Sequence, residues 1–310
     1  MQPTIAIAFK IPEDILSGLR TWAHVVEHQD ATALPASQWQ TRLNQADGVL
    51  ISVFNPVSAD QLTHTAALRM ISSVGVGLNH IDLKACQEAK VHVANTPGVI
   101  NHPTADHAFA LLLGASRNVV GADRLVRAGQ WTQPIAPMMG MDVHHRRIGI
   151  VGFGGVGQQI ARRAIGFDMR VHYHQRHRLP TAQEQALQAT YTPLSELLQI
   201  SDFVVLQVPY NPSTHHMIGA RELALMPKHA MLVNTARGGV LDEDALADAL
   251  EQGRIAGAAL DVFENEPHIN PRLLQAPNLL LTPHLGSATA ATRHEMISMA
   301  ANHLHQFFNE

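Results

Sequence analysis

Short runs of apolar, β-prone residues recur along the chain, separated by segments long enough for a helix or an irregular crossover. The first set lies at residues 4–9, 23–27, 49–53, 70–74 and 91–94. A second set lies at residues 148–151, 170–174, 203–208, 230–234, 256–261 and 279–281. Strands that alternate with such crossovers are typical of parallel α/β sheets. We therefore predict two doubly wound sheets, one from each set of strands.

Apolar residues at helical spacing occupy several of the longer segments between these runs. Residues 104–127 carry such a stripe, and we predict one long helix there. Residues 194–199 and 242–252 are also predicted to be helical, and Asp242 gives the latter an acidic start. The final segment, residues 288–308, is amphipathic. We expect it to return to the first domain and cover it.

A glycine cluster follows the strand predicted at residues 148–151. Gly152, Gly154 and Gly157 form the pattern G-x-G-x-x-G where the chain enters a predicted helix at residues 156–167. The first glycine permits a tight turn, the second lets the backbone approach a pyrophosphate, and the third lets the helix pack against the strand. Free N–H groups at the helix start favour an anion. This order predicts a dinucleotide site, and the alternative is a glycine-rich turn between two core elements.

The residues that end the second strand of this unit bear on which dinucleotide is bound. A site for an unmodified ribose 2′-hydroxyl carries Asp or Glu there, whereas this chain has His174, Gln175 and Arg176 and no carboxylate. Arg176, with help from Gln175 and Arg178, is suited to a 2′-phosphate through charge-assisted hydrogen bonds. We therefore predict NADP(H) in preference to NAD(H), with NAD(H) possible. The alternative is that these arginines only form a solvated turn.

A break in the pattern at Asn95-Thr96-Pro97-Gly98 divides the chain. Proline restricts the residue before it and glycine follows at once, so a hinge is expected there. A chain of 310 residues is long enough for two domains. We predict a substrate domain made of residues 1–97 and 287–310, and a dinucleotide-binding domain at residues 98–286.

Composition narrows the classes of partner. The net charge of -4, from 22 Lys and Arg against 26 Asp and Glu, provides no basic field for nucleic acid or an anionic membrane. No apolar run reaches the roughly 18 residues that a membrane span needs, and residues 1–9 do not form a signal sequence. We therefore predict a cytoplasmic protein that acts on small molecules.

Neither the cysteine nor the histidines favour a metal site. The single cysteine, Cys86, excludes a cysteine cluster and is interpreted as an apolar filler on a helix. The 20 histidines contain no H-E-x-x-H pattern. The pairs His144/His145 and His215/His216 are adjacent, so their side chains would diverge on a regular element. His172 and His174 could share one face of a strand; otherwise we expect no metal.

Polar motifs follow three later strands, at the edge of the sheet where ligands bind in such folds. They read N-T-A-R-G at residues 234–238, D-V-F-E-N-E-P at 261–267 and P-H-L-G at 283–286. Together they resemble the D-isomer-specific 2-hydroxyacid dehydrogenase family, with its motifs N-x-x-R-G, D-V-F-x-x-E-P and P-H-x-G. The resemblance extends to residues 75–77 and 94–98 and covers nearly the whole chain. It implies a Rossmann domain beside a flavodoxin-like substrate domain, and a homodimer, for which the apolar helix at residues 104–127 is a further indication.

The resemblance implies a role for each motif residue. Arg237 matches the family's substrate arginine, Glu266 its acidic partner, and His284 its acid/base histidine. A guanidinium fork can bind the carboxylate of a 2-oxoacid while polarising the adjacent carbonyl. An imidazole held by a carboxylate can protonate the alkoxide that hydride transfer creates. Within the family, the chain most resembles the glyoxylate/hydroxypyruvate reductase type and is similar to 2-ketogluconate reductase.

Two groups of binding residues follow. The backbone N–H groups of Val76 and Gly77 match donors for the substrate carboxylate, beside Arg237 and His284. The expected dinucleotide-binding residues are Gly152, Gly154, Gly155, Val156, Gly157, His174, Gln175, Arg176, Pro209, Thr235, Arg237, Asp261, His284 and Gly286. Among these, Gly155 and Val156 would meet the pyrophosphate, Pro209 the adenosine, and Asp261 and Gly286 the nicotinamide end.

The chain also departs from the family. His102 and His107 lie at the start of the helix predicted at residues 104–127, and His107 replaces a frequent apolar residue. Met138 and Met139 stand in the loop that often carries a tryptophan in these reductases, so a flexible thioether wall would leave the identity of the 2-oxoacid open. One alternative is an NAD-linked D-2-hydroxyacid dehydrogenase. Another is a corepressor-like protein that senses a dinucleotide. Formate dehydrogenase would require glutamine in place of Glu266.

Overall fold

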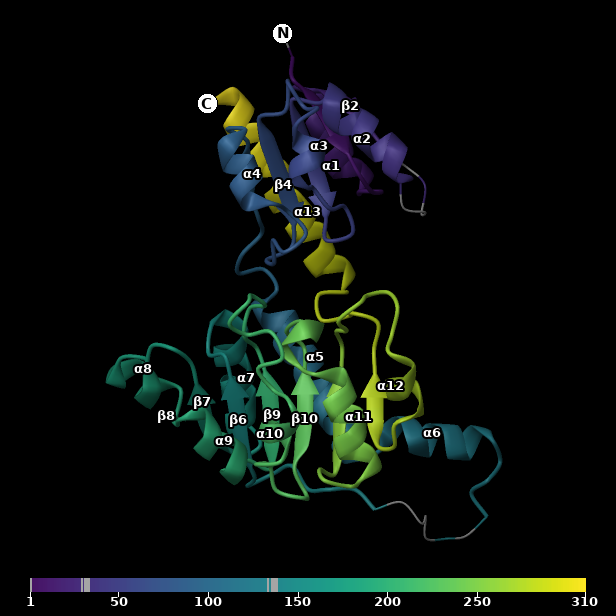
Figure 1. Ribbon diagram of the computed structural model, residues 1–310, viewed down its shortest axis with the longest axis vertical. Helices are drawn as coiled ribbons and strands as arrows, with labels where there is room; N and C mark the ends of the chain where they lie inside the picture. The colour runs from purple at the N-terminus through teal and green to yellow at the C-terminus, as the bar shows by residue number, and fades with distance from the viewer. Residues whose placement is uncertain (1, 29, 31–33, 133, 135–138) are drawn as a thin grey trace. The chain divides into compact units, whose positions relative to one another are not determined.

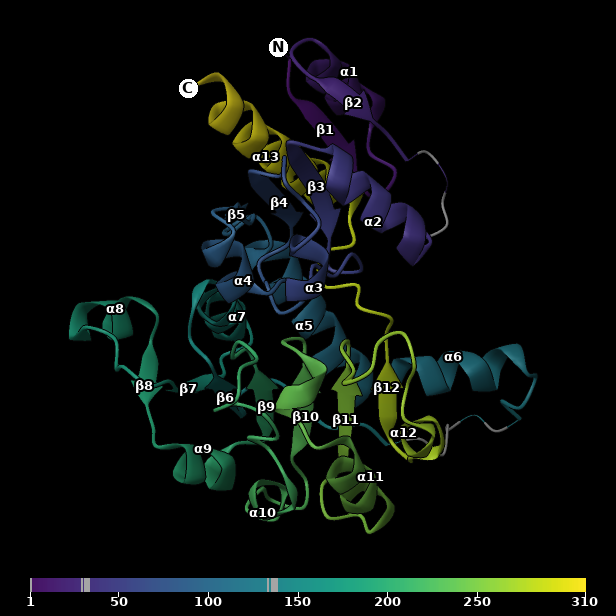
Figure 2. The same cartoon turned by 45° about the horizontal axis from the view of Figure 1, so that its top comes forward.

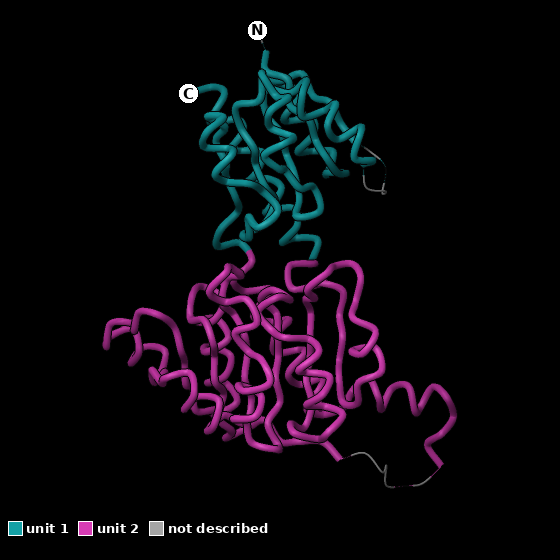
Figure 3. Tube along the Cα trace, viewed as in Figure 1, with its two compact units in different colours: residues 1–99, 289–310 teal, residues 100–288 magenta. Residues whose placement is uncertain are grey.

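A computed structural model describes residues 2–28, 30, 34–132, 134 and 139–310. The chain forms two compact units, one made of residues 1–99 with 289–310 and the other of residues 100–288 (Figure 3). Each unit has its own parallel sheet and its own core. The prediction of two parallel α/β sheets is confirmed.

The first unit has a five-stranded sheet (Figure 1). Its strands are β1 (Thr4–Ile7), β2 (His24–Val26), β3 (Gly48–Ser52), β4 (Met70–Val74) and β5 (His92–Ala94), in the order β2-β1-β3-β4-β5. That order is the flavodoxin-like one. Its helices are α1 (Glu13–Arg20), α2 (Ala36–Gln45), α3 (Ala59–Leu62), α4 (Leu83–Glu88) and α13 (Ala290–Asn309).

The last helix, α13, is built into this first unit. It packs on β4, and the hydroxyl of Ser72 donates a hydrogen bond to the carbonyl of Ala300 over 2.8 Å. Its residues Leu304 and Phe308 lie so close to Gly48 that a Cβ at that glycine would be 2.7 Å from the Phe308 ring. The C-terminal segment of the chain therefore covers one face of a sheet formed by the N-terminal segment.

The second unit has a seven-stranded parallel sheet. Its strands are β6 (Arg147–Val151), β7 (Arg170–His174), β8 (Ala189–Tyr191), β9 (Phe203–Leu206), β10 (Met231–Asn234), β11 (Gly257–Leu260) and β12 (Leu279–Leu281), in the order β12-β11-β10-β9-β6-β7-β8. With β6 counted as the first strand, this is the Rossmann order 3-2-1-4-5-6 with a seventh strand added. From β6 the next strands, β7 and β8, are added on one side, and β9 to β12 are added on the other. Such folds bind ligands at this switch point between β6 and β9.

Helices cover both faces of the seven-stranded sheet (Figure 2). The helices of this unit are α5 (Asn101–Ser116), α6 (Val119–Arg127), α7 (Gly155–Ile165), α8 (Thr181–Ala186), α9 (Leu194–Ile200), α10 (Ala220–Leu223), η1 (Gly238–Val240), α11 (Glu243–Glu251) and α12 (Pro271–Gln275). Side chains alternate along a strand, so Phe203 and Val205 of β9 pack with α5 and α7. Val204 and Leu206 pack instead with α9, α10 and α11. Both faces are buried, which explains the nearly continuous apolar strands of the sequence.

The prediction of one long helix at residues 104–127 is wrong. The chain forms α5 and α6, and Asn118 between them adopts φ +47°. Asparagine tolerates this left-handed conformation better than most residues, and the stripe of apolar residues gave no sign of it. Helix α5 has seven buried residues, whereas α6 has none. The sequence also missed β8, which has three residues and pairs only with β7.

Candidate functional site

The glycine turn between β6 and α7 forms a cradle of backbone groups. Gly152 adopts φ +96°, its N–H donates to the carbonyl of His174 over 2.8 Å, and a Cβ there would lie 2.5 Å from the backbone of Gln207. A Cβ at Gly157 would lie 2.4 Å from the carbonyl oxygen of Gly152. Both positions therefore require glycine.

The start of α7 is suited to an anion. Gly154 is its N-cap, has no atom within 4 Å of an added Cβ, and provides no side-chain cap. The first N–H groups of a helix lack intrahelical acceptors and attract negative charge. Gly155 and Val156 are the first two residues of α7. The turn therefore fits the pyrophosphate of a dinucleotide.

The polar residues at the end of β7 and just after it differ in their hydrogen-bond partners. His174 ends the strand with Nδ1 3.2 Å from the carbonyl oxygen of Thr192. Arg178 donates two hydrogen bonds to Glu184, of 2.9 and 2.8 Å, and the Glu184 side chain is only 7% exposed. Glu184 therefore orients Arg178. The sequence predicted that Arg178 assists Arg176 in binding a 2′-phosphate, and it did not indicate this bond to Glu184. Arg176 is exposed and, within the described part of the chain, has no hydrogen-bond or ion-pair partner.

His284 and Glu266 form a hydrogen-bonded pair. The Nδ1 atom of His284 lies 2.7 Å from Oε2 of Glu266, and the two side chains are 30% and 23% exposed. The other carboxylate oxygen of Glu266 accepts the backbone N–H of Phe263 over 2.9 Å. Burial alone would raise the pKa of Glu266, but the bond from His284, its charge and the Phe263 N–H hold that pKa below its ordinary value. Because an ionised carboxylate only accepts, Nδ1 of His284 carries the hydrogen.

The backbone fixes this histidine as well. His284 adopts φ +56°, and its N–H donates to the carbonyl of Asp261 over 2.8 Å. A non-glycine residue in the left-handed region is uncommon and is found most often where the surrounding structure demands it. The imidazole is therefore positioned both by its backbone and by Glu266.

Arg237 follows β10 in a turn organised by Asn234. The side-chain oxygen of Asn234 accepts the N–H of Ala236 over 3.0 Å, and its amide donates to the carbonyl of Arg237 over 3.1 Å. Gly238 lies against the backbone of Phe263, where a Cβ would be 1.9 Å away. Burial lowers the pKa of the Arg237 guanidinium, and the Glu266 carboxylate acts in the opposite direction. Arg237, Glu266 and His284 thus belong to one partly buried group at the carboxyl ends of β10, β11 and β12.

Asp261 is the most heavily bonded carboxylate of this region. It is buried and accepts hydrogen bonds from the N–H groups of Leu285 and Gly286, at 2.7 and 2.8 Å, and from the hydroxyl of Thr282 at 2.6 Å. Nε2 of His107 lies 3.1 Å from Oδ1 of Asp261. Burial would raise the pKa of Asp261, but the bonds from His107, Thr282 and Leu285 hold it below its ordinary value. His107, which replaces a frequent apolar residue of the family, thus binds Asp261, and no sequence motif indicates this contact.

The remaining predicted residues lie at other strand ends. Thr235 follows β10 and is buried, and its hydroxyl accepts a hydrogen bond from the amide of Gln207. Pro209 follows β9, and its carbonyl accepts the hydroxyl of Thr214 over 2.8 Å. Val76 and Gly77 belong to the other unit, just after β4, where the amide of Asn95 donates to the Val76 carbonyl over 2.8 Å.

Cys86 is buried in α4, and burial, with a smaller contribution from Asp82, raises the pKa of its thiol to about 11. Met139 is 91% exposed, and Met138 lies outside the described residues. In the described ranges, no helix combines the length and apolar character that a membrane crossing requires.

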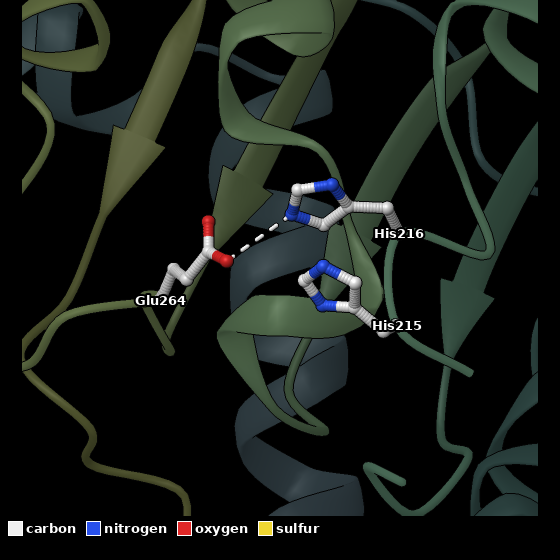
Figure 4. Close-up of side chains that lie close together, drawn as sticks. All are labelled: His215, His216 and Glu264. Carbon is white, nitrogen blue, oxygen red and sulfur yellow. Dashed lines mark hydrogen bonds and ion pairs between the residues drawn. The ribbon is translucent and has the colours of Figure 1, made fainter. Parts of the chain in front are cut away.

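His215 and His216 do not lie on a regular element, and their side chains do not diverge. They lie in a turn, and His216 adopts φ +48°. Their rings stack with centroids 3.9 Å apart (Figure 4). The reason is local: the divergence of neighbouring side chains holds on a regular element, and this turn is not one.

The fold and the site together define a dinucleotide-dependent dehydrogenase of the α/β class. The chain belongs to the D-isomer specific 2-hydroxyacid dehydrogenase family, because the model of the NAD binding domain of that family matches residues 109–286. The resemblance predicted from the motifs is thereby confirmed. The protein is an enzyme, an oxidoreductase with an NAD(P)-binding domain.

Three known proteins are similar over nearly the full length. A glyoxylate reductase of Thermococcus gammatolerans is 41% identical over 100% of this chain and 94% of its own. A glyoxylate/hydroxypyruvate reductase B of Klebsiella pneumoniae is 39% identical over 98% of this chain and 94% of its own. The crystal structure of an NADPH-dependent glyoxylate/hydroxypyruvate reductase of Sinorhizobium meliloti, in complex with NADP and malonate, is 31% identical. It has a TM-score of 0.85 and covers 99% of this chain and 94% of that one.

Proposed function

We propose that this protein reduces a small 2-oxoacid, such as glyoxylate or hydroxypyruvate, to the D-2-hydroxyacid with NADPH. The observation that carries the proposal is the His284–Glu266 pair beside Arg237, in the same unit as a glycine turn built for a pyrophosphate. The names of the similar reductases support the same substrate class.

Arg237 is the proposed substrate-binding cation. A 2-oxoacid presents a carboxylate and a carbonyl oxygen side by side, and the planar guanidinium can bind the first and polarise the second. Partial burial strengthens this interaction because less water competes for the charge. We further propose that the backbone N–H groups of Val76 and Gly77 bind the substrate carboxylate.

His284 is the proposed proton donor. NADPH, when bound, supplies a hydride to the carbonyl carbon, and the carbonyl oxygen then needs a proton. With Nδ1 bonded to Glu266, Nε2 of His284 is the nitrogen that can give it. Glu266 remains ionised at neutral pH, since its pKa is held low, and so stabilises the protonated imidazole. In the reverse direction His284 would take the proton back.

The choice of NADPH rests on the end of β7. Positions 174–176 are His, Gln and Arg. None of them provides a carboxylate that would accept a hydrogen bond from a ribose 2′-hydroxyl or repel a 2′-phosphate. Arg176 is exposed, and the described residues leave its guanidinium unpaired. We propose that Arg176 binds the 2′-phosphate. Asp261 and Gly286 are proposed to face the nicotinamide end, Pro209 the adenosine, and Thr235 the rest of the dinucleotide.

We also propose a homodimer, with α6 at the interface. Its residues Val119 and Val126 are 55% and 56% exposed, and Trp131 beyond it is 58% exposed. Exposed apolar groups of this kind favour association with a second surface. Sedimentation of the purified protein should give twice the mass of the 33.8 kDa chain. A monomer at micromolar concentration would contradict this part of the proposal.

A steady-state assay tests the function. The decrease in nicotinamide absorbance is followed with NADPH or NADH against glyoxylate, hydroxypyruvate, pyruvate and 2-ketogluconate. We expect turnover with at least one of the first two and a higher kcat/KM with NADPH than with NADH. Absence of turnover with all four acids, together with tight dinucleotide binding, would favour a sensor over a reductase.

A further inference from the structure

Two histidines and a glutamate converge at a place that the proposed reaction does not use (Figure 4). His215 and His216 lie in the turn between β9 and α10, and Glu264 lies in the turn after β11. Both turns belong to the second unit. In the described part of the chain, this is the one group of three His, Cys, Asp or Glu side chains close enough to share a metal ion.

The distances suit coordination. Nε2 of His216 lies 3.2 Å from Oε1 of Glu264, and the ligand atoms of all three side chains lie within 4.8 Å of one another. Two ligand atoms bound to one tetrahedral zinc ion are about 3.4 Å apart, given bonds of about 2.1 Å. The His216 and Glu264 atoms are therefore already at this spacing. The ligand atom of His215 lies within 4.8 Å of these two.

The backbone holds the two turns in this arrangement without an ion. The N–H of His216 donates to the carbonyl of Gly239 over 2.8 Å, with His216 in the left-handed conformation. The N–H of Glu264 donates to the carboxylate of Glu243 over 2.8 Å. A site formed in advance loses less entropy when its ligand binds.

His215 also has the outer partner that metal-bound histidines commonly use. Its Nδ1 lies 3.2 Å from the hydroxyl of Tyr210. When Nδ1 donates its hydrogen to that oxygen, the lone pair of Nε2 is left for a metal ion. Such partners orient the ring and increase its affinity for metal.

We propose that His215, His216 and Glu264 bind a divalent transition-metal ion, with Zn²⁺ the best match. Two imidazoles and one carboxylate are a known zinc ligand set, and water would complete the tetrahedron. Imidazole nitrogen selects against Mg²⁺ and Ca²⁺, which prefer oxygen ligands. The side chains of His216 and Glu264 are 36% and 32% exposed, so an ion can reach them from solvent.

Binding at this place would tie the turn after β9 to the turn after β11. The second turn also carries Glu266, two residues beyond Glu264, whose carboxylate accepts the Phe263 N–H. An ion that binds the folded chain and not the unfolded one stabilises the fold, and the stabilisation grows with the logarithm of the ion concentration once that exceeds the dissociation constant. Zn²⁺ should therefore raise the Tm of the whole protein.

Calorimetric titration of the metal-stripped full-length protein with Zn²⁺ tests the proposal. Wild type should bind one ion more than His216→Ala. Glu264→Gln should weaken that ion by at least about tenfold, and Tyr210→Phe by about tenfold with the stoichiometry unchanged. Titration with Co²⁺ should give visible absorption typical of low coordination number in wild type, which His216→Ala lacks.

The matched control is His144→Ala combined with His145→Ala. This pair is also adjacent and exposed, and His145 has φ +60°, but its rings lie 5.1 Å apart at 80° and do not stack. The control should retain the ion and its effect on Tm. Equal zinc binding by wild type and His216→Ala would overturn the proposal. So would no zinc binding by wild type, which would identify His216 and Glu264 as a surface ion pair only.

Discussion

Oε2 of Glu266 accepts a hydrogen bond from Nδ1 of His284 over 2.7 Å, between residues that are 18 positions apart in sequence. The bond holds the imidazole in the tautomer that leaves Nε2 for a substrate. It also couples the two groups electrostatically, since the pKa of Glu266 is below its ordinary value. The carboxylate therefore acts on the reaction through the histidine.

Replacing Glu266 by glutamine should separate this role from substrate binding. Glu266→Gln removes the charge that favours the imidazolium, so kcat should fall on the order of 10²-fold, while KM for the 2-oxoacid changes much less. Steady-state kinetics with glyoxylate checks this. Unchanged kcat across the neutral pH range would contradict the role of Glu266.

The same substitution should change stability in acid. The folded-state pKa of Glu266 is below its ordinary value of 4.5. The ionised Glu266 carboxylate therefore stabilises the fold fully at pH values above the pKa that this group has in the unfolded chain. This contribution is lost as the pH falls through the folded-state pKa. Urea denaturation midpoints of wild type should drop more steeply below about pH 4.5 than those of Glu266→Gln. Parallel curves would contradict the pKa shift.

Arg176 should decide between the two dinucleotides. Arg176→Ala removes a charge-assisted bond to the 2′-phosphate, so KM for NADPH should rise about tenfold, and KM for NADH should stay nearly the same. Arg178→Ala is the control, because Glu184 already binds that guanidinium. It should change the ratio of the two KM values much less than Arg176→Ala does. Equal losses for NADPH and NADH in Arg176→Ala would refute the assignment.

His107 should position Asp261. His107→Leu removes one hydrogen bond from a buried carboxylate and should lower the free energy of unfolding by about 1–3 kcal/mol. If Asp261 faces the nicotinamide, KM for the dinucleotide should rise as well. His107→Gln, which can keep a donor near Asp261, should recover part of both effects. A denaturation midpoint and a KM that match wild type would show that the contact with Asp261 has no energetic effect.

Much of the fold follows from local patterns. The predicted bounds of β4, β7 and β12 coincide with the observed ones, since short runs of β-prone residues mark parallel strands. The glycine turn could be predicted because the contacts that require Gly152 and Gly157 are short-range. A Cβ at Gly157 would meet Gly152, and a Cβ at Gly152 would meet Gln207 beyond the end of the neighbouring strand β9. The break at Asn118 was missed because a single left-handed residue does not disturb the apolar stripe.

The site was predictable only in part. The motifs identified Arg237, Glu266 and His284 individually, whereas the 2.7 Å bond between the last two depends on the turns after β11 and β12. His107 and Asp261 are 154 positions apart, and no local pattern links them. The convergence of His215, His216 and Glu264 depends on a backbone angle at His216 and on two separate turns. Tertiary structure alone brings such groups together.

The most direct test of the account is the oxidation of NADPH by glyoxylate in His284→Asn, measured in a single turnover beside wild type. Asparagine can still bond to Glu266 but cannot donate a proton from an imidazolium. The account predicts a Kd for NADPH that changes little and a rate of oxidation lower by about 10²–10⁴-fold. Oxidation at nearly the wild-type rate would contradict His284 as the proton donor and, with it, the proposed mechanism.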